Sequence, residues 1–178
     1  MHRHIFRMLG AAALLVFTAA AADSPATGIR WGQFWGTWVW QTQVVPGVAF
    51  PTLITFNIDG TITGADSGGM TEGALHGVWE RTGFQSLGGT TLYFMFDAQS
   101  GVVMAFARTR SSLNFSKDFN QFQGTMFLET LACPAGPPSC PDPLDPTAQW
   151  VAWPGMPADG FPVSGARLQR VPAGPLVR

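Results

Sequence analysis

The sequence predicts an all-β protein, an eight-stranded antiparallel up-and-down barrel, with a two-sheet β-sandwich as the alternative. Three observations support this class. Short apolar or alternating segments recur between residues 35 and 131 without helical periodicity. Turn sequences rich in Gly, Asp, Asn and Ser separate these segments, so neighbours in sequence are expected to pair as antiparallel hairpins. Eight such strands lose their exposed edges when they close into a barrel.

The chain begins with a predicted signal peptide, residues 1–22. Arg3 and Arg7 precede an apolar run that is too short to span a bilayer, and small residues precede a cleavage point after Ala22. We therefore expect a secreted or periplasmic protein with no stable membrane anchor after cleavage. The following segments are an N-terminal lead-in (23–33), barrel strands one to seven (34–131), a Pro- and Trp-rich loop (132–162), a closing strand (163–171) and a tail (172–178).

Eight segments are predicted to be strands: 35–42, 52–57, 61–65, 74–81, 90–97, 102–115, 121–131 and 163–171. The connection between the second and third strands contains Asp59-Gly60, a strong hairpin signal because both residues tolerate a positive φ. Turns are also expected at 86–90, 98–101 and 116–120.

The loop 132–162 interrupts this pattern, because its many prolines exclude a central strand. Cys133 and Cys140 are the two cysteines of the chain, and in an exported protein we expect them to form a disulfide. Trp150 and Trp153 make the loop too apolar for a free linker. We expect an Ω-like excursion, held by the disulfide, that lies over one end of the barrel.

Composition excludes several functions. His76 is the one histidine outside the predicted signal peptide, so we do not expect a zinc site built on two or three histidines. For the same reason, no second histidine is available to activate a Ser or Cys nucleophile. The formal net charge is −1, and no basic cluster suggests a nucleic acid partner. We expect neither a metal nor a cofactor.

The stretch Gly36-Thr37-Trp38 resembles the G-x-W motif that opens lipocalins, a calycin-type barrel family. In order along the chain, "GTW", "FNIDGT", "HGVWERTG" and "FQGT" are also similar to small secreted bacterial lipocalin-like proteins of uncertain function, over about residues 34–131. The resemblance implies that Trp38 lies at the barrel floor beside Gly36, under a late arginine, Arg167 or Arg170. It implies a fold and no particular ligand.

Bulky apolar residues and two arginines are the candidate ligand contacts. Strand alternation puts Met104, Phe106, Arg108 and Arg110 on one face, a row suited to a cavity with an apolar floor and a polar mouth. The predicted ligand-binding residues are Trp40, Phe56, Trp79, Phe94, Phe106, Arg108 and Arg110. The arginines would bind an acidic group. Alternatively, both arginines end the strand in solvent or pair with Glu80, Asp97 or Asp118, and the barrel is filled by its own side chains.

Three functions remain open. The first is binding of a small apolar or weakly anionic molecule without transforming it. The second is a filled structural or protein-interaction barrel, whose exposed Trp150 and Trp153 contact a protein partner through residues 144–160. The third is a cyclase- or isomerase-type enzyme, which would require His76, Glu80, Tyr93 or Arg108 to converge in a cavity. We assign no catalytic residue and expect binding rather than catalysis.

Overall fold

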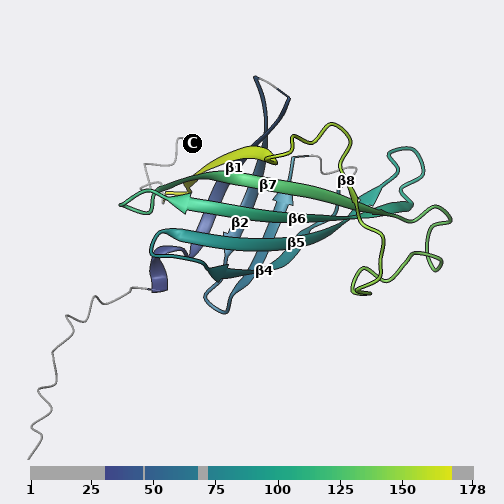
Figure 1. The fold of residues 1–178 in the computed structure, drawn as a ribbon, viewed down its shortest axis with the longest axis horizontal. Coiled ribbons are helices and arrows are strands. Elements are labelled where there is room, and N and C mark those ends of the chain that lie inside the picture. The colour runs from purple at the N-terminus through teal and green to yellow at the C-terminus, as the bar shows by residue number, and fades with distance from the viewer. Residues whose placement is uncertain (1–30, 46, 68–71, 170–178) are drawn as a thin grey trace, which may run out of the picture.

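The computed structural model describes residues 31–45, 47–67 and 72–169, and these form one 3-10 helix and nine strands (Figure 1). The elements are η1 (Trp31–Gln33), β1 (Gly36–Val45), β2 (Val48–Phe56), β3 (Thr61–Asp66), β4 (Leu75–Arg81), β5 (Ser86–Phe96), β6 (Val103–Phe115), β7 (Gln121–Ala132), β8 (Val151–Ala152) and β9 (Phe161–Arg167). The predicted signal peptide, the tail 172–178 and Arg170 lie outside the described residues. No helix within the described ranges has the length and apolar composition needed to cross a bilayer.

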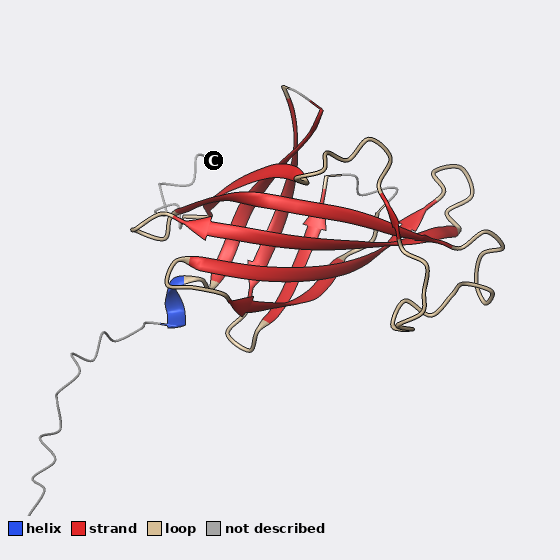
Figure 2. Ribbon diagram, in the orientation of Figure 1, coloured by secondary structure: helices blue, strands red, loops and turns tan. Residues whose placement is uncertain are grey.

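Eight of the strands form a closed antiparallel barrel (Figure 2). Strands β1 to β7 pair in sequence order, and β9 closes the sheet because it pairs with both β7 and β1. The two-residue β8 adds to the far end of β7, where β9 no longer pairs. The predicted up-and-down barrel is confirmed, and the β-sandwich alternative is wrong.

The barrel has two different ends. We call one end the base: it carries η1 and the turns 57–60, 82–85 and 116–120, and it lies at the left in Figure 1. We call the other end the mouth: it carries the connections that follow β1, β3, β5 and β7. The last of these is the long loop 133–160, which we call the Pro/Trp loop.

One expected turn is wrong. Residues 86–90 belong to β5, and the chain reverses instead at 82–85, where the amides of Thr82 and Gly83 donate to the carbonyl of Ser86. Of the two glycines that suggested the turn, Gly89 faces the interior of the barrel and Gly88 faces outward. A Cβ atom at Gly89 would lie 3.1 Å from Cδ1 of Ile62 in β3 and 3.0 Å from Oγ of Ser111. The expected turns at 98–101 and 116–120 are confirmed, and so is the hairpin at Gly60, whose φ is 85°.

Aromatic rings fill the base of the barrel. Trp38 is fully buried, and the rings of Phe56, Phe115 and Phe122 lie around it with centroid distances of 6.4, 5.2 and 5.4 Å. Phe34 packs against the same group from the segment before β1. Edge-on and tilted contacts of this kind add to the burial of apolar area, so the base is a solid core.

Arg167 joins four parts of the base. Its guanidinium carbon lies 4.5 Å from the centroid of the Trp38 ring, and Nε donates to the carbonyl of Phe119 at 3.1 Å. Nη1 and Nη2 donate to the carbonyls of Trp35 and Gln33. Burial lowers the pKa of Arg167, although an arginine stays charged at neutral pH. The contact thus ties β9 to η1, to β1 and to the turn between β6 and β7.

Gly36 leaves room for this arginine. Its φ of 125° is a conformation that residues with a side chain rarely adopt, and a Cβ atom there would lie 3.0 Å from Nη1 of Arg167. A glycine at this position therefore permits both the backbone path into β1 and the close approach of the guanidinium.

The Pro/Trp loop has two parts. Cys133 and Cys140 form the expected disulfide at the start of the loop. The first part then follows the outer wall, where Trp150 lies over Arg108 at 4.2 Å. The second part reaches the mouth, where Trp153 and Met156 pack against the buried interior cluster. The expectation that the whole loop covers one end is therefore correct only for its second part.

Candidate functional site

The row of β6 that was expected to line the interior lies outside the barrel. Ala105, Ala107 and Thr109 point inward and are buried, so Phe106 and Arg108 occupy the outer face. Ala107 packs there in one cluster with the larger side chains of Leu75, Tyr93, Leu128 and Phe161. The predicted cavity with an apolar floor of phenylalanine and a mouth of arginine is therefore wrong.

Phe94 and Arg110 share this outer location. Phe94 is 47% exposed, and its ring lies 5.3 Å from that of Phe106. The Arg110 side chain is 58% exposed. Four of the predicted ligand-binding residues are thus brought together, on the outer wall of β5 and β6 rather than in the interior.

The three other predicted contacts lie inside the barrel. Phe56 is buried in the aromatic core of the base, and Trp79 packs against that core and donates to the carbonyl of Asn57 at 3.0 Å. Trp40 lies nearer the mouth and borders a cavity of about 50 Å³. Ligand pockets commonly enclose roughly 300–1,000 Å³, so the interior is substantially filled by its own side chains.

A much larger groove lies on the outer wall. It encloses about 580 Å³ between the first part of the Pro/Trp loop and strands β5, β6 and β7. Its lining includes Leu92, Arg108, Glu129, Pro143, Leu144 and Trp150. We call this feature the outer groove.

Glu129 holds Arg108 of the outer groove and the neighbouring Arg110 in place. Its Oε2 accepts from Nε of Arg108 at 3.0 Å and lies 2.9 Å from Nη2, while Oε1 accepts from Arg110 at 3.0 Å. Within the described residues, Nη1 of Arg108 makes no hydrogen bond. The Trp150 ring and the Glu129 carboxylate hold the Arg108 guanidinium in one position. The two N–H groups on its Nη1 therefore remain available to a ligand.

Sequence reasoning did not identify Glu129, since it considered Glu80, Asp97 and Asp118 as the partners. A signal was available. The turn at 116–120 sets the register of β6 and β7, and that register places Arg108 directly opposite Glu129.

The residues considered for catalysis do not converge. His76 and Glu80 are exposed on the outer face of β4, and Arg108 lies on the outer face of β6. Tyr93 alone among these four points into the barrel, where it is buried. No group of three or more His, Cys, Asp or Glu residues in the described ranges could hold a metal ion.

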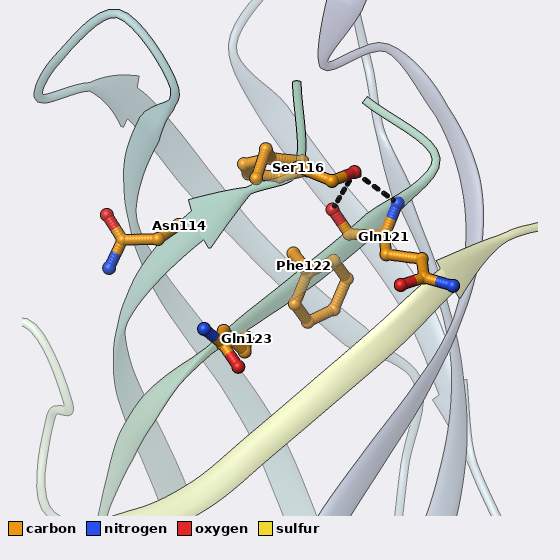
Figure 3. A pocket seen from close by; sticks show the side chains of 6 residues that line it. Asn114, Ser116, Gln121, Phe122 and Gln123 are labelled. Atoms are coloured by element: carbon orange, nitrogen blue, oxygen red, sulfur yellow. Dashed lines mark hydrogen bonds between the residues drawn. The ribbon is translucent and has the colours of Figure 1, made fainter. Parts of the chain in front are cut away.

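A further hollow of about 270 Å³ lies at the base, beside the turn that joins β6 and β7 (Figure 3). Its side chains are mainly exposed amides, those of Asn114, Gln121 and Gln123. Ser116 Oγ closes the turn, since it accepts from the amide of Gln121 and donates to the same residue's carbonyl. These groups serve the turn, and none of the described residues that line the hollow is charged.

Comparison with known proteins finds no family model, no curated protein and no solved structure that matches the chain. The architecture is the eight-stranded antiparallel barrel that the resemblance to lipocalins implies. Membership of that family stays a prediction.

Proposed function

We propose that this chain is a non-catalytic binding protein, and that its ligand is a small apolar molecule with an acidic group. The site is the outer groove. One observation carries the proposal: a fixed guanidinium with unused N–H groups borders a groove of about 580 Å³, whereas the interior cavity encloses only about 50 Å³.

The two halves of such a ligand have different partners. Its apolar part would contact Leu92, Leu144 and the ring of Trp150. Its acidic group would accept hydrogen bonds from Nη1 of Arg108, and charge-assisted hydrogen bonds of this kind are stronger than neutral ones. The contacts of Arg108 with Glu129 and Trp150 hold the guanidinium in one position, which lowers the entropic cost of binding.

The test is a series of matched ligands. We expect medium-chain carboxylates to raise the melting temperature of the protein, and the alcohols of equal length to raise it less. Arg108→Gln should weaken carboxylate binding about tenfold or more, as expected for the loss of a hydrogen bond to a charged group. Arg110→Gln is the control, because Arg110 also binds Glu129 but does not line the outer groove. Equal effects of the two substitutions, or no stabilisation by any ligand, would refute the proposal.

A protein partner is the second candidate function, although not through the residues expected at first. Trp150 and Trp153 are partly buried and packed against the barrel, so the expectation that both are exposed is wrong. Leu144 and Val151 of the same segment are 83% and 63% exposed. Replacing both with Ser should abolish binding of a protein partner and leave the melting temperature nearly unchanged; an unchanged affinity would exclude 144–160 as the contact.

We also propose that the protein is secreted or periplasmic. The disulfide between Cys133 and Cys140 supports this location, because such bonds persist in oxidising compartments. The predicted signal peptide is consistent with it. Mass spectrometry of the exported protein should find an N-terminus at Asp23; an intact Met1 would contradict cleavage.

A further inference from the structure

The interior cavity has an unusual lining for a barrel core. It lies in the mouth half and is bordered by hydroxyl groups from several strands: Thr42, Thr52, Thr91, Thr109 and Ser111. The four threonines are all at least nine-tenths buried. Buried polar groups of this kind require partners, so their gathering around one small space is a feature to be explained.

Three of these five hydroxyl groups donate their hydrogen within the structure: Thr52, Ser111 and one member of the Thr91–Thr109 pair. The indole N–H of Trp40 donates to Thr42 Oγ1 at 2.8 Å, and Thr52 Oγ1 donates to Asp66 at 3.0 Å. Thr91 and Thr109 bond to each other at 2.6 Å. A hydroxyl oxygen accepts up to two hydrogen bonds, so the cavity presents more acceptors than donors.

Tyr93 adds an independent observation. Its side chain lines the cavity and is only 8% exposed, yet its hydroxyl has no hydrogen-bond partner among the described residues. Burial, and then the charges of Glu72 and Asp66, raise the pKa of Tyr93, so it is a neutral phenol. No fully buried side-chain nitrogen or oxygen in the described residues lacks a hydrogen-bond partner, so the Tyr93 hydroxyl is reached by solvent and is free to accept a hydrogen bond from a bound donor.

The charge around the cavity is negative. Asp66 lines it, and Glu72 lies near enough to interact with both Asp66 and Tyr93. Among the described residues, no Lys or Arg lines the cavity. A volume of about 50 Å³ holds roughly three to five water molecules, at about 10–15 Å³ each.

We propose that this cavity binds a small primary ammonium group, either the ammonium ion itself or a short alkylammonium. Asp66 supplies the opposite charge, and the hydroxyl oxygens of Tyr93 and Thr52 accept N–H hydrogen bonds. The indole of Trp40 on the cavity wall adds an aromatic surface, which favours a cation. This site is separate from the outer groove, and it can be present or absent whatever binds there.

The test uses the full, disulfide-bonded chain at about pH 8 and follows the NMR resonance of the Trp40 indole N–H. Methylammonium chloride is titrated at constant ionic strength against tetramethylammonium, potassium and sodium chlorides. We expect a saturable shift with methylammonium alone, because a quaternary ion has no N–H group and is too large for the cavity. The same response to potassium or tetramethylammonium would overturn the proposal and show that the cavity binds cations in general. No response to methylammonium would also overturn it and would mean that the cavity holds water.

Three variants locate the site. Asp66→Asn should raise the dissociation constant at least about tenfold, and Tyr93→Phe about three- to tenfold. Asp97→Asn is the control, since Asp97 is an exposed carboxylate at the mouth that does not line the cavity. An unchanged dissociation constant in a folded Asp66→Asn protein would refute the assignment. If that variant does not fold, Tyr93→Phe decides, because its lost hydroxyl has no partner in the described structure.

Discussion

Replacing Arg167 with Gln should lower the free energy of unfolding by about 3–5 kcal/mol. The contact of the guanidinium with Trp38 contributes about 0.5–2 kcal/mol. The substitution also leaves the carbonyls of Gln33, Trp35 and Phe119 without their charged donor. Each such bond contributes up to about 1.5–3 kcal/mol, and we take about 1 kcal/mol for each because water can reach this partly exposed site.

Urea denaturation followed by tryptophan fluorescence measures this loss. A shift of the midpoint with an unchanged m-value indicates a change in stability rather than in the compactness of either state. Arg110→Gln is the control and should cost less than about 1 kcal/mol, because Arg110 is largely exposed. A double-mutant cycle of Arg167→Gln with Trp38→Leu should give a coupling of about 0.5–2 kcal/mol. A loss below 1 kcal/mol for Arg167→Gln would refute the reasoning that this residue holds the base together.

Three further predictions concern the loop, the mouth and the first strand. Replacing Cys133 and Cys140 with Ser should cost about 2–2.5 kcal/mol in urea unfolding, since the disulfide closes a short loop; an equal stability with and without reductant would contradict this. Burial and a nearby carboxylate raise the pKa of Glu72 to about 7, so its contribution to stability is greatest below pH 4.5 and is lost as the pH rises through 7. Because Glu72 is partly exposed, Glu72→Gln should remove only about 1–2 kcal/mol of the change in unfolding free energy that accompanies this rise in pH. Parallel curves of unfolding free energy against pH for the two proteins would exclude this contribution of Glu72. Gly36→Ala should cost more than Gly101→Ala, because both glycines have a positive φ but only the first would also place a Cβ atom beside another residue; similar melting temperatures would refute the close approach.

Much of the fold could be predicted because each strand carries its own signal. The alternating segments and the Asp59-Gly60 hairpin define antiparallel neighbours, and closure follows from the need to cover the edges. The error at residues 86–90 has a clear cause. A pair of glycines predicts a turn, but in β5 Gly89 leaves space for Ile62 and Ser111 inside the barrel.

The candidate site could be predicted only in part. Phe94, Phe106, Arg108 and Arg110 do lie together, because they occupy matching rows of two paired strands. Their location outside the barrel could not be deduced, since both rows of β6 contain apolar residues. Alternation predicts that two faces exist and does not say which one points inward.

The resemblance to lipocalins implied the small residue at Gly36, and the sequence by itself determined the barrel, its strand order and the disulfide. These follow from local preferences and from the chemistry of neighbouring residues. Only the tertiary structure decided that the interior is nearly filled, that the first part of the Pro/Trp loop packs on the outer wall, and that hydroxyl groups and the carboxylate of Asp66 line the remaining cavity. The physical reason is that these features depend on the combined volume of side chains from all eight strands, which no single segment encodes.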